Sequence, residues 1–92
     1  MMGEYRIEVL EKKHAMKLLL ILMDGDLMKG ELASHVTVGT ASVQARVADL
    51  VEAGLLTETS ENVKPFRKMI GLTDKGREVA ESIRHVEDLL LQ

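Results

Sequence analysis

The residues whose types and spacing are most suggestive of chemistry lie in the stretch SVQARVADLVEAGLL, positions 42–56. Valine and leucine recur three and four residues apart, at 43, 47, 50 and 51, so they share one face of a helix. The opposite face carries small side chains, with two longer polar ones on its flanks: Ala41, Ser42, Gln44, Ala45 and Arg46. Small residues permit close approach, an amide pairs with adenine, and a guanidinium binds guanine or phosphate. The alternative is that alanine is simply the best helix former and that Gln44 and Arg46 are solvated.

A second candidate site is a cluster of positive charge after the middle of the chain. Between positions 64 and 77 there are five cations and one acid, namely Lys64, Arg67, Lys68, Lys75, Arg77 and Asp74. This segment has a net charge of +4, whereas the whole chain has −3. Lysine and arginine supply the phosphate contacts that dominate non-specific affinity for nucleic acid. We predict that Lys64, Arg67 and Lys68 contact a phosphate backbone; the alternative is that these charges only protect an edge strand.

The other polar residues do not have the pattern of an enzyme or a metal site. His14, His35 and His85 are far apart, and none has a second ligand at a spacing of four residues. The chain has no cysteine, and in so short a chain no Ser/His/Asp or paired-carboxylate arrangement has a pocket in prospect. The sequence therefore predicts no catalytic residue, no metal and no cofactor.

Length and composition predict one domain over residues 1–92. Ninety-two residues leave no room for two cores, and a hydrophobic fraction of 46% is ordinary for a globular protein. The longest apolar run, Leu18 to Met23, is far shorter than the roughly 20 residues that span a bilayer. The start of the chain lacks the basic character of a signal peptide. We expect a cytoplasmic protein without a membrane partner.

Periodicity and capping residues divide the chain into helices and a hairpin. We predict helices over about 12–23, 29–35, 40–53 and 74–91, and a two-stranded hairpin over about 55–72. Gly39 or Thr40 is the expected N-cap of the third helix, Gly54 its C-cap, and Thr73 the N-cap of the last helix. In the returning strand, Phe66, Ile70 and Leu72 are expected to share a face. Residues 5–11 fit either a short helix or a strand.

This order of elements defines a fold class. Two short helices joined by a tight turn, followed by a hairpin, describe a winged helix-turn-helix, an α+β fold that is mainly helical. The predicted architecture is a three-helix core, a two-stranded wing and a C-terminal dimerisation helix. In this docking geometry the second helix of the pair, residues 40–53, enters the major groove, and the wing lies on the DNA backbone.

Several motifs carry a resemblance to known regulators. ELASHVTVGTASVQARVADLVEAGLL followed by LTDKGREV resembles the winged-helix regulators of the MarR and ArsR type. The matching residues are Leu32, Ala33, Leu50, Gly54, Leu55 and Leu56. LTDKG at 72–76 is similar to the segment that leads MarR-like and HxlR-like wings into their last helix. IEVLEKKHAMKLLLIL is similar to the HxlR-like opening, although it lacks the tryptophan usual there. The resemblance covers roughly residues 7–85 and implies a transcriptional regulator.

The last helix predicts self-association. Its apolar residues recur four, three and four positions apart, at Val79, Ile83, Val86 and Leu90, which is a narrow seam of the kind two helices share. Leu89 and Leu91 widen the apolar surface at the end of the chain. The run at 18–23 is apolar nearly all round and offers a second surface for a partner. We expect a homodimer that buries both surfaces about a two-fold axis.

The sequence thus favours a homodimeric, sequence-specific DNA-binding transcriptional regulator, with double-stranded DNA and a second copy as its partners. The alternative is a winged helix that serves as a protein–protein interaction module without DNA binding, which the net acidity favours. Whether a small-molecule effector exists stays unknown. MarR-like regulators often bind ligands between their dimerisation helices and the DNA-binding lobe, and this chain lacks the extra helical length that usually builds that pocket.

Overall fold

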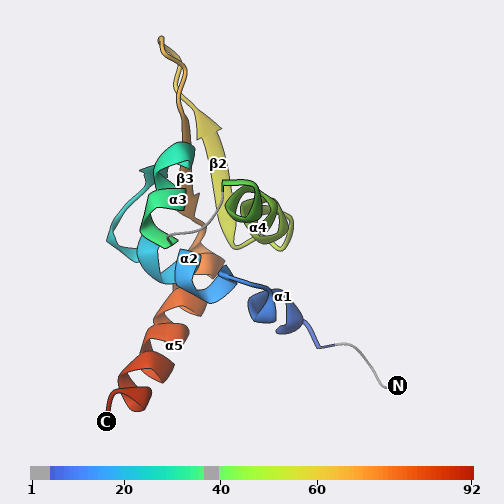
Figure 1. Ribbon diagram of the computed structural model, residues 1–92, viewed down its shortest axis with the longest axis vertical. Helices are drawn as coiled ribbons and strands as arrows, with labels where there is room; N and C mark the ends of the chain where they lie inside the picture. The colour runs from blue at the N-terminus through green and yellow to red at the C-terminus, as the bar shows by residue number, and fades with distance from the viewer. Residues whose placement is uncertain (1–4, 37–39) are drawn as a thin grey trace.

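The computed structural model describes residues 5–36 and 40–92 and shows a mainly helical fold with a small antiparallel sheet (Figure 1). The elements are α1 (Glu8–Glu11), α2 (Ala15–Ile21), the 3-10 turn η1 (Leu22–Asp24), β1 (Leu27–Met28), α3 (Lys29–Val36), α4 (Thr40–Glu52), β2 (Leu56–Ser60), β3 (Lys68–Leu72) and α5 (Asp74–Leu90). The β2–β3 hairpin and the end of α5 project to opposite ends of the molecule. The predicted winged-helix fold is confirmed.

The start of the chain differs from the expected continuous helix over 12–23. His14 has a left-handed backbone with φ +71°, which separates α1 from α2. The helix ends early, because Leu22–Asp24 tighten into a 3-10 turn before Gly25, whose φ is +142°. Residues 5–11, which fitted a helix or a strand, contain the single helical turn α1. The N-cap expected at Gly39 or Thr40 lies outside the described side chains.

The sheet has a third strand that the sequence did not predict. Its order is β1-β3-β2, and both pairs are antiparallel. β1 contributes only two residues, with Leu27 opposite Ile70 and Met28 opposite Met69. Two residues are too few to show an alternating pattern, so a sequence reading misses such a strand. β1 directly precedes α3 and pairs with β3 of the hairpin. This pairing therefore fixes the position of the helix-turn-helix relative to the hairpin.

The predicted hydrophobic faces form most of the core, with two corrections. Val43, Val47 and Leu50 are at most 1% exposed and hold α4 against the leucines of α2, α3 and β2. Val51, expected on the same face, is 36% exposed. Phe66 does not share a face with Ile70 and Leu72, because it precedes β3, has φ +55° and is exposed.

A junction between the end of α4 and the start of α5 joins the parts of the fold. Gly54 has φ +81°, and the Leu55 amide donates to the Leu50 carbonyl at 3.0 Å, which ends α4 in a left-handed C-cap as predicted. The Thr73 amide donates to the Leu55 carbonyl at 3.1 Å. The Thr73 hydroxyl donates to the Gly54 carbonyl at 2.6 Å and accepts from the Gly76 amide at 2.9 Å. Thr73 is therefore the predicted N-cap of α5 and also its attachment to α4.

Gly76 is required by this junction. A Cβ at this position would lie 1.9 Å from the Leu55 carbonyl oxygen, a backbone atom that cannot turn aside. We predict that Gly76→Ala destabilises the protein by about 1–3 kcal/mol, the usual range for overpacking. Gly30→Ala in α3 is the control, because nothing lies within 4 Å of its added Cβ, and it should stabilise by about 0.5–1 kcal/mol. Urea denaturation at one protein concentration checks both; equal stabilities would contradict the prediction.

Candidate nucleic-acid interface

The outer face of α4 is exposed and made mostly of small side chains. Ala41, Ser42, Gln44, Ala45 and Ala48 are all exposed. The opposite, buried face of the same helix fixes their direction. Alanine and serine side chains extend little beyond the backbone, so a flat or grooved partner can approach the helix axis closely. This surface has the shape that a recognition helix needs.

Arg46, predicted on a flank of this face to bind guanine or phosphate, is held by other groups of the protein in this structure. Its Nε donates to the Lys13 carbonyl at 2.8 Å, and its guanidinium pairs with Asp49. Lys12 binds the same carboxylate at 3.4 Å, and only 18% of the Arg46 side chain is exposed. To reach DNA, Arg46 would have to give up both partners. The structure therefore gives Arg46 a fixing role, because it attaches α4 to the junction between α1 and α2.

His14 lies at the same junction. Its Nε2 is buried and has no hydrogen-bond partner among the described residues. Burial lowers the pKa of His14 below its ordinary value, and the positive charges of Lys13, Lys17 and Arg46 lower it further. The folded protein therefore favours the neutral imidazole more than the unfolded chain does.

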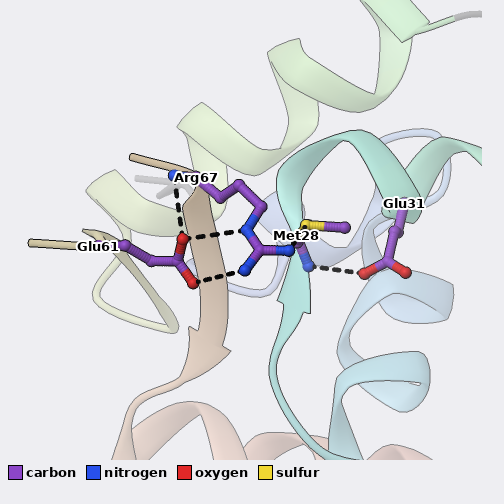
Figure 2. Close-up of polar contacts among 4 residues, drawn as sticks. All are labelled: Met28, Glu31, Glu61 and Arg67. Atoms are coloured by element: carbon purple, nitrogen blue, oxygen red, sulfur yellow. Dashed lines mark hydrogen bonds and ion pairs between the residues drawn. The ribbon is translucent and has the colours of Figure 1, made fainter. Parts of the chain in front are cut away.

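The wing cation Arg67 is paired with a glutamate of the same hairpin (Figure 2). Its Nε lies 3.0 Å from Glu61 Oε1 and its Nη2 lies 3.2 Å from Oε2, a two-pronged ion pair. The Arg67 amide also donates to Oε1 at 3.3 Å. These bonds lower the pKa of Glu61 and raise that of Arg67. The remaining nitrogen, Nη1, lies 3.6 Å from the sulfur of Met28 beside α3.

Lys68 is also paired with a wing glutamate. Its Nζ lies 3.5 Å from Glu58, and Lys29 at the start of α3 binds the same carboxylate at 3.3 Å. The positive segment at positions 64–77 does not include Glu58 and Glu61. These two acids precede it in the sequence, but the hairpin brings them next to its cations. Over residues 55–72 the net charge is +1. The third predicted cation, Lys64, is exposed in the turn between the strands.

A groove of about 380 Å³ brings these elements together. It is lined by residues of β1, α3, α4 and the wing, namely Met28, Lys29, Gly30, Glu31, Gln44, Arg67 and Lys68. Of the predicted DNA-binding residues it unites Gln44 with Arg67 and Lys68. It also includes Lys29, which sequence analysis missed. The sequence feature that could have identified Lys29 is its place at the start of α3, the helix that precedes α4.

The predicted dimer seam divides into two parts. Val79 and Ile83 are partly buried against the core of their own domain. Val86 and Leu90 are 52% and 75% exposed, and Leu89 and Leu91 are exposed beside them. The run at 18–23 does not form a second open surface as expected. α5 packs on α2, so Leu18, Leu19 and Leu22 are buried, and the other three residues are half-buried.

The exposed small-residue helix, the wing beside it and the order of the helices define a winged helix-turn-helix protein. The family model of the HxlR-like helix-turn-helix matches residues 9–91, and the chain belongs to this family. This confirms the resemblance seen in the motifs. The family model describes a helix-turn-helix, and two of the similar structures are described as MarR-family transcriptional regulators, in agreement with the expectation that the protein is not an enzyme.

Solved structures share the fold at low identity. A MarR-family transcriptional regulator from Porphyromonas gingivalis W83 has a TM-score of 0.85 and 14% identity, over 100% of this chain and 97% of that one. Reduced YodB, a transcriptional regulator from B. subtilis, gives 0.81 and 17%, over 95% and 90%. The adhesin competence repressor AdcR from Streptococcus pyogenes gives 0.79 and 23%, over 86% of this chain. The match covers only 58% of AdcR. No curated protein matches the sequence.

Among the described residues, no group of three or more His, Cys, Asp or Glu side chains is placed to hold a metal ion. No helix in the described ranges is long and apolar enough to cross a bilayer.

The environment of His14 predicts a pH-dependent stability. Because its pKa is lower in the folded protein than in the unfolded chain, the unfolded chain binds more protons, and stability falls as pH decreases through the ordinary histidine range. We expect the urea midpoint to fall between about pH 8 and pH 5.5, and His14→Asn to reduce this fall. Asparagine tolerates the left-handed backbone at this position. His35→Asn, which replaces an exposed histidine, should keep the wild-type dependence. An equal fall in all three proteins would contradict the assignment.

Proposed function

We propose that the protein is a homodimeric, sequence-specific DNA-binding transcriptional regulator. α4 enters the major groove, and the wing contacts the phosphate backbone. The observation that carries this proposal is the exposed small-residue face of α4, which lies next to a groove lined by Gln44 and by cations of the wing and α3. Membership of the HxlR-like helix-turn-helix family supports it.

The face of α4 gives each residue a distinct role. Ala41 and Ala45 allow the helix to approach the base edges, and their methyl groups can contact thymine methyls. Gln44 and Ser42 supply hydrogen bonds to bases, with Gln44 suited to adenine. Arg46 is left out of base reading because its guanidinium serves the α1–α2 junction. Lys64, Arg67 and Lys68 bind phosphates and carry no sequence information.

The distribution of charge permits DNA binding in a chain with a net charge of −3. α5 has a net charge of −2, and α1 carries Glu8 and Glu11. The wing, at the other end of the long axis from the end of α5, has a net charge of +1. The acidic end of α5 is therefore separate from the wing.

The alternative is a protein–protein interaction module without DNA binding. Two observations favour it: Arg67 and Lys68 are paired with glutamates, and the end of α5 exposes Val86, Leu89 and Leu90. Titration against random duplex DNA at several salt concentrations separates the two functions. A DNA-binding protein shows binding that weakens steeply with salt, whereas absence of binding at low salt would favour the interaction module.

Ala45→Glu tests the placement of α4. It adds bulk and negative charge where the helix is proposed to approach the bases most closely, so we expect DNA binding to be lost while the fold is retained. Gln92→Glu adds the same charge beyond the end of α5 and should leave binding nearly unchanged. Circular dichroism checks that both variants fold. Normal binding by Ala45→Glu would mean that the alanines are present only for helix stability.

Val86→Glu combined with Leu90→Glu tests the dimer. Both side chains are exposed in the single chain, so the double variant should fold. Each buried leucine or valine contributes roughly 1.5–3 kcal/mol, so the loss of both from each subunit should yield a monomer. The monomer should bind DNA far more weakly, because it offers one recognition helix instead of two at half-sites about one helical turn apart. Sedimentation that shows a monomeric wild type would contradict the dimer.

A further inference from the structure

We propose that the groove between α3 and the wing is a binding site for one DNA backbone phosphate, and that this phosphate replaces Glu61 as the partner of Arg67. The inference rests on the proposed DNA-binding function. It adds a site and a competing residue that the winged-helix fold does not by itself specify. Glu61 would then limit the affinity for DNA rather than support it.

The groove gathers donors from three elements. Lys29 comes from the start of α3, Gln44 from α4, and Arg67 and Lys68 from the wing. Gln44 belongs to the face proposed to read bases, so a backbone passing from α4 to the wing would cross this groove. The carboxylate of Glu58 lies 3.3 Å from Lys29 Nζ and 3.5 Å from Lys68 Nζ, and so it holds the two ammonium groups close together.

Within the groove, Arg67 has strong partners on one edge and a weak one on the other. Nε and Nη2 are bound to the two oxygens of Glu61. Nη1 points to the Met28 sulfur at 3.6 Å, as Figure 2 shows. A thioether is a weak acceptor, whereas a phosphate oxygen is a strong, charged one. Nη1 is therefore the nitrogen that a phosphate entering the groove would bind first.

Glu61 and a phosphate compete for the same donors. A carboxylate and a phosphate each present two oxygens that fit the fork of a guanidinium, so both cannot occupy Nε and Nη2 together. The pair is accessible: 51% of the Arg67 side chain and 29% of the Glu61 side chain are exposed. An exposed ion pair is weak enough to be exchanged. The low pKa of Glu61 keeps the competitor charged at neutral pH.

The competition predicts a gain of affinity when the carboxylate is removed. Glu61→Gln should bind random duplex DNA more tightly than wild type by up to about fivefold, the equivalent of one exposed ion pair. The slope of log affinity against log salt should stay the same, because the same phosphates are contacted in both complexes. Glu81→Gln is the matched control, since it makes the same change of charge on the side of α5 opposite the seam, and it should raise affinity less.

The double variant Glu61→Gln with Arg67→Ala identifies the mechanism. Without Arg67 the phosphate has no donor to take over, so the gain should disappear relative to Arg67→Ala alone. Urea denaturation of each variant checks that the protein remains folded.

Four results would overturn the exchange. Weaker binding by Glu61→Gln would mean that Glu61 positions Arg67 for DNA. A gain no larger than that of Glu81→Gln, a gain that survives the loss of Arg67, or a steeper salt slope would each show that no exchange occurs. These results leave DNA binding itself intact. Failure of wild type and all variants to bind duplex DNA at low salt would instead refute the proposed function together with this site.

Discussion

The carbonyl group of Leu55 is the point on which the arrangement of the fold depends. It accepts a hydrogen bond from the Thr73 amide, and it lies so close to Gly76 that no side chain fits there. One residue earlier, Gly54 ends α4, and one residue later β2 begins. The end of α4, the start of the wing and the start of α5 therefore meet within a few ångströms. A shift of any of them would break hydrogen bonds or bring the α5 backbone against Leu55.

This junction connects the two surfaces that the proposed dimeric regulator would use. α4 carries the small-residue face, and α5 carries the exposed apolar residues at its far end. A long, continuous helix transmits position with little bending, so the angle at the junction would set how far apart two copies hold their recognition helices. β1 makes a second backbone connection of this kind, since its pairing with β3 fixes the start of α3 against the wing. The surface proposed for DNA is thus held by backbone contacts.

The parts of the fold that could be predicted are those with signals local in the sequence. Val43, Val47 and Leu50 repeat at helical spacing, and Gly54 and Thr73 are residues that caps prefer, so the elements around them were visible. β1 was not visible because two residues show no period. Phe66 lies an even number of residues before Ile70 and Leu72, as a residue on the same face of a strand would. Its left-handed backbone, which belongs to the turn, removes it from that face.

The candidate site was predicted less completely, because ion pairs join residues that are distant in sequence. Arg46 binds the carbonyl of Lys13, thirty-three positions away, and a backbone carbonyl leaves no trace in residue type. Lys29 and Lys68 meet at Glu58 only because α3 and the wing converge. Exposure of Ala41, Ser42, Gln44 and Ala45 followed from the helical period alone. Which cations remain available to a ligand depends on tertiary contacts.

These pairings change what net charge means for this protein. A count over the chain gives −3, and a count over positions 64–77 gives +4, but neither describes the surface that a ligand meets. Between α3 and the wing, Lys29, Arg67 and Lys68 face Glu31, Glu58 and Glu61, a local balance near zero. Attraction over long distance is then weak there, and salt screens the acidic end of α5 from a polyanion at the wing, at the opposite end of the molecule. Binding of DNA to this surface would therefore depend on short-range contacts that form after the two molecules meet.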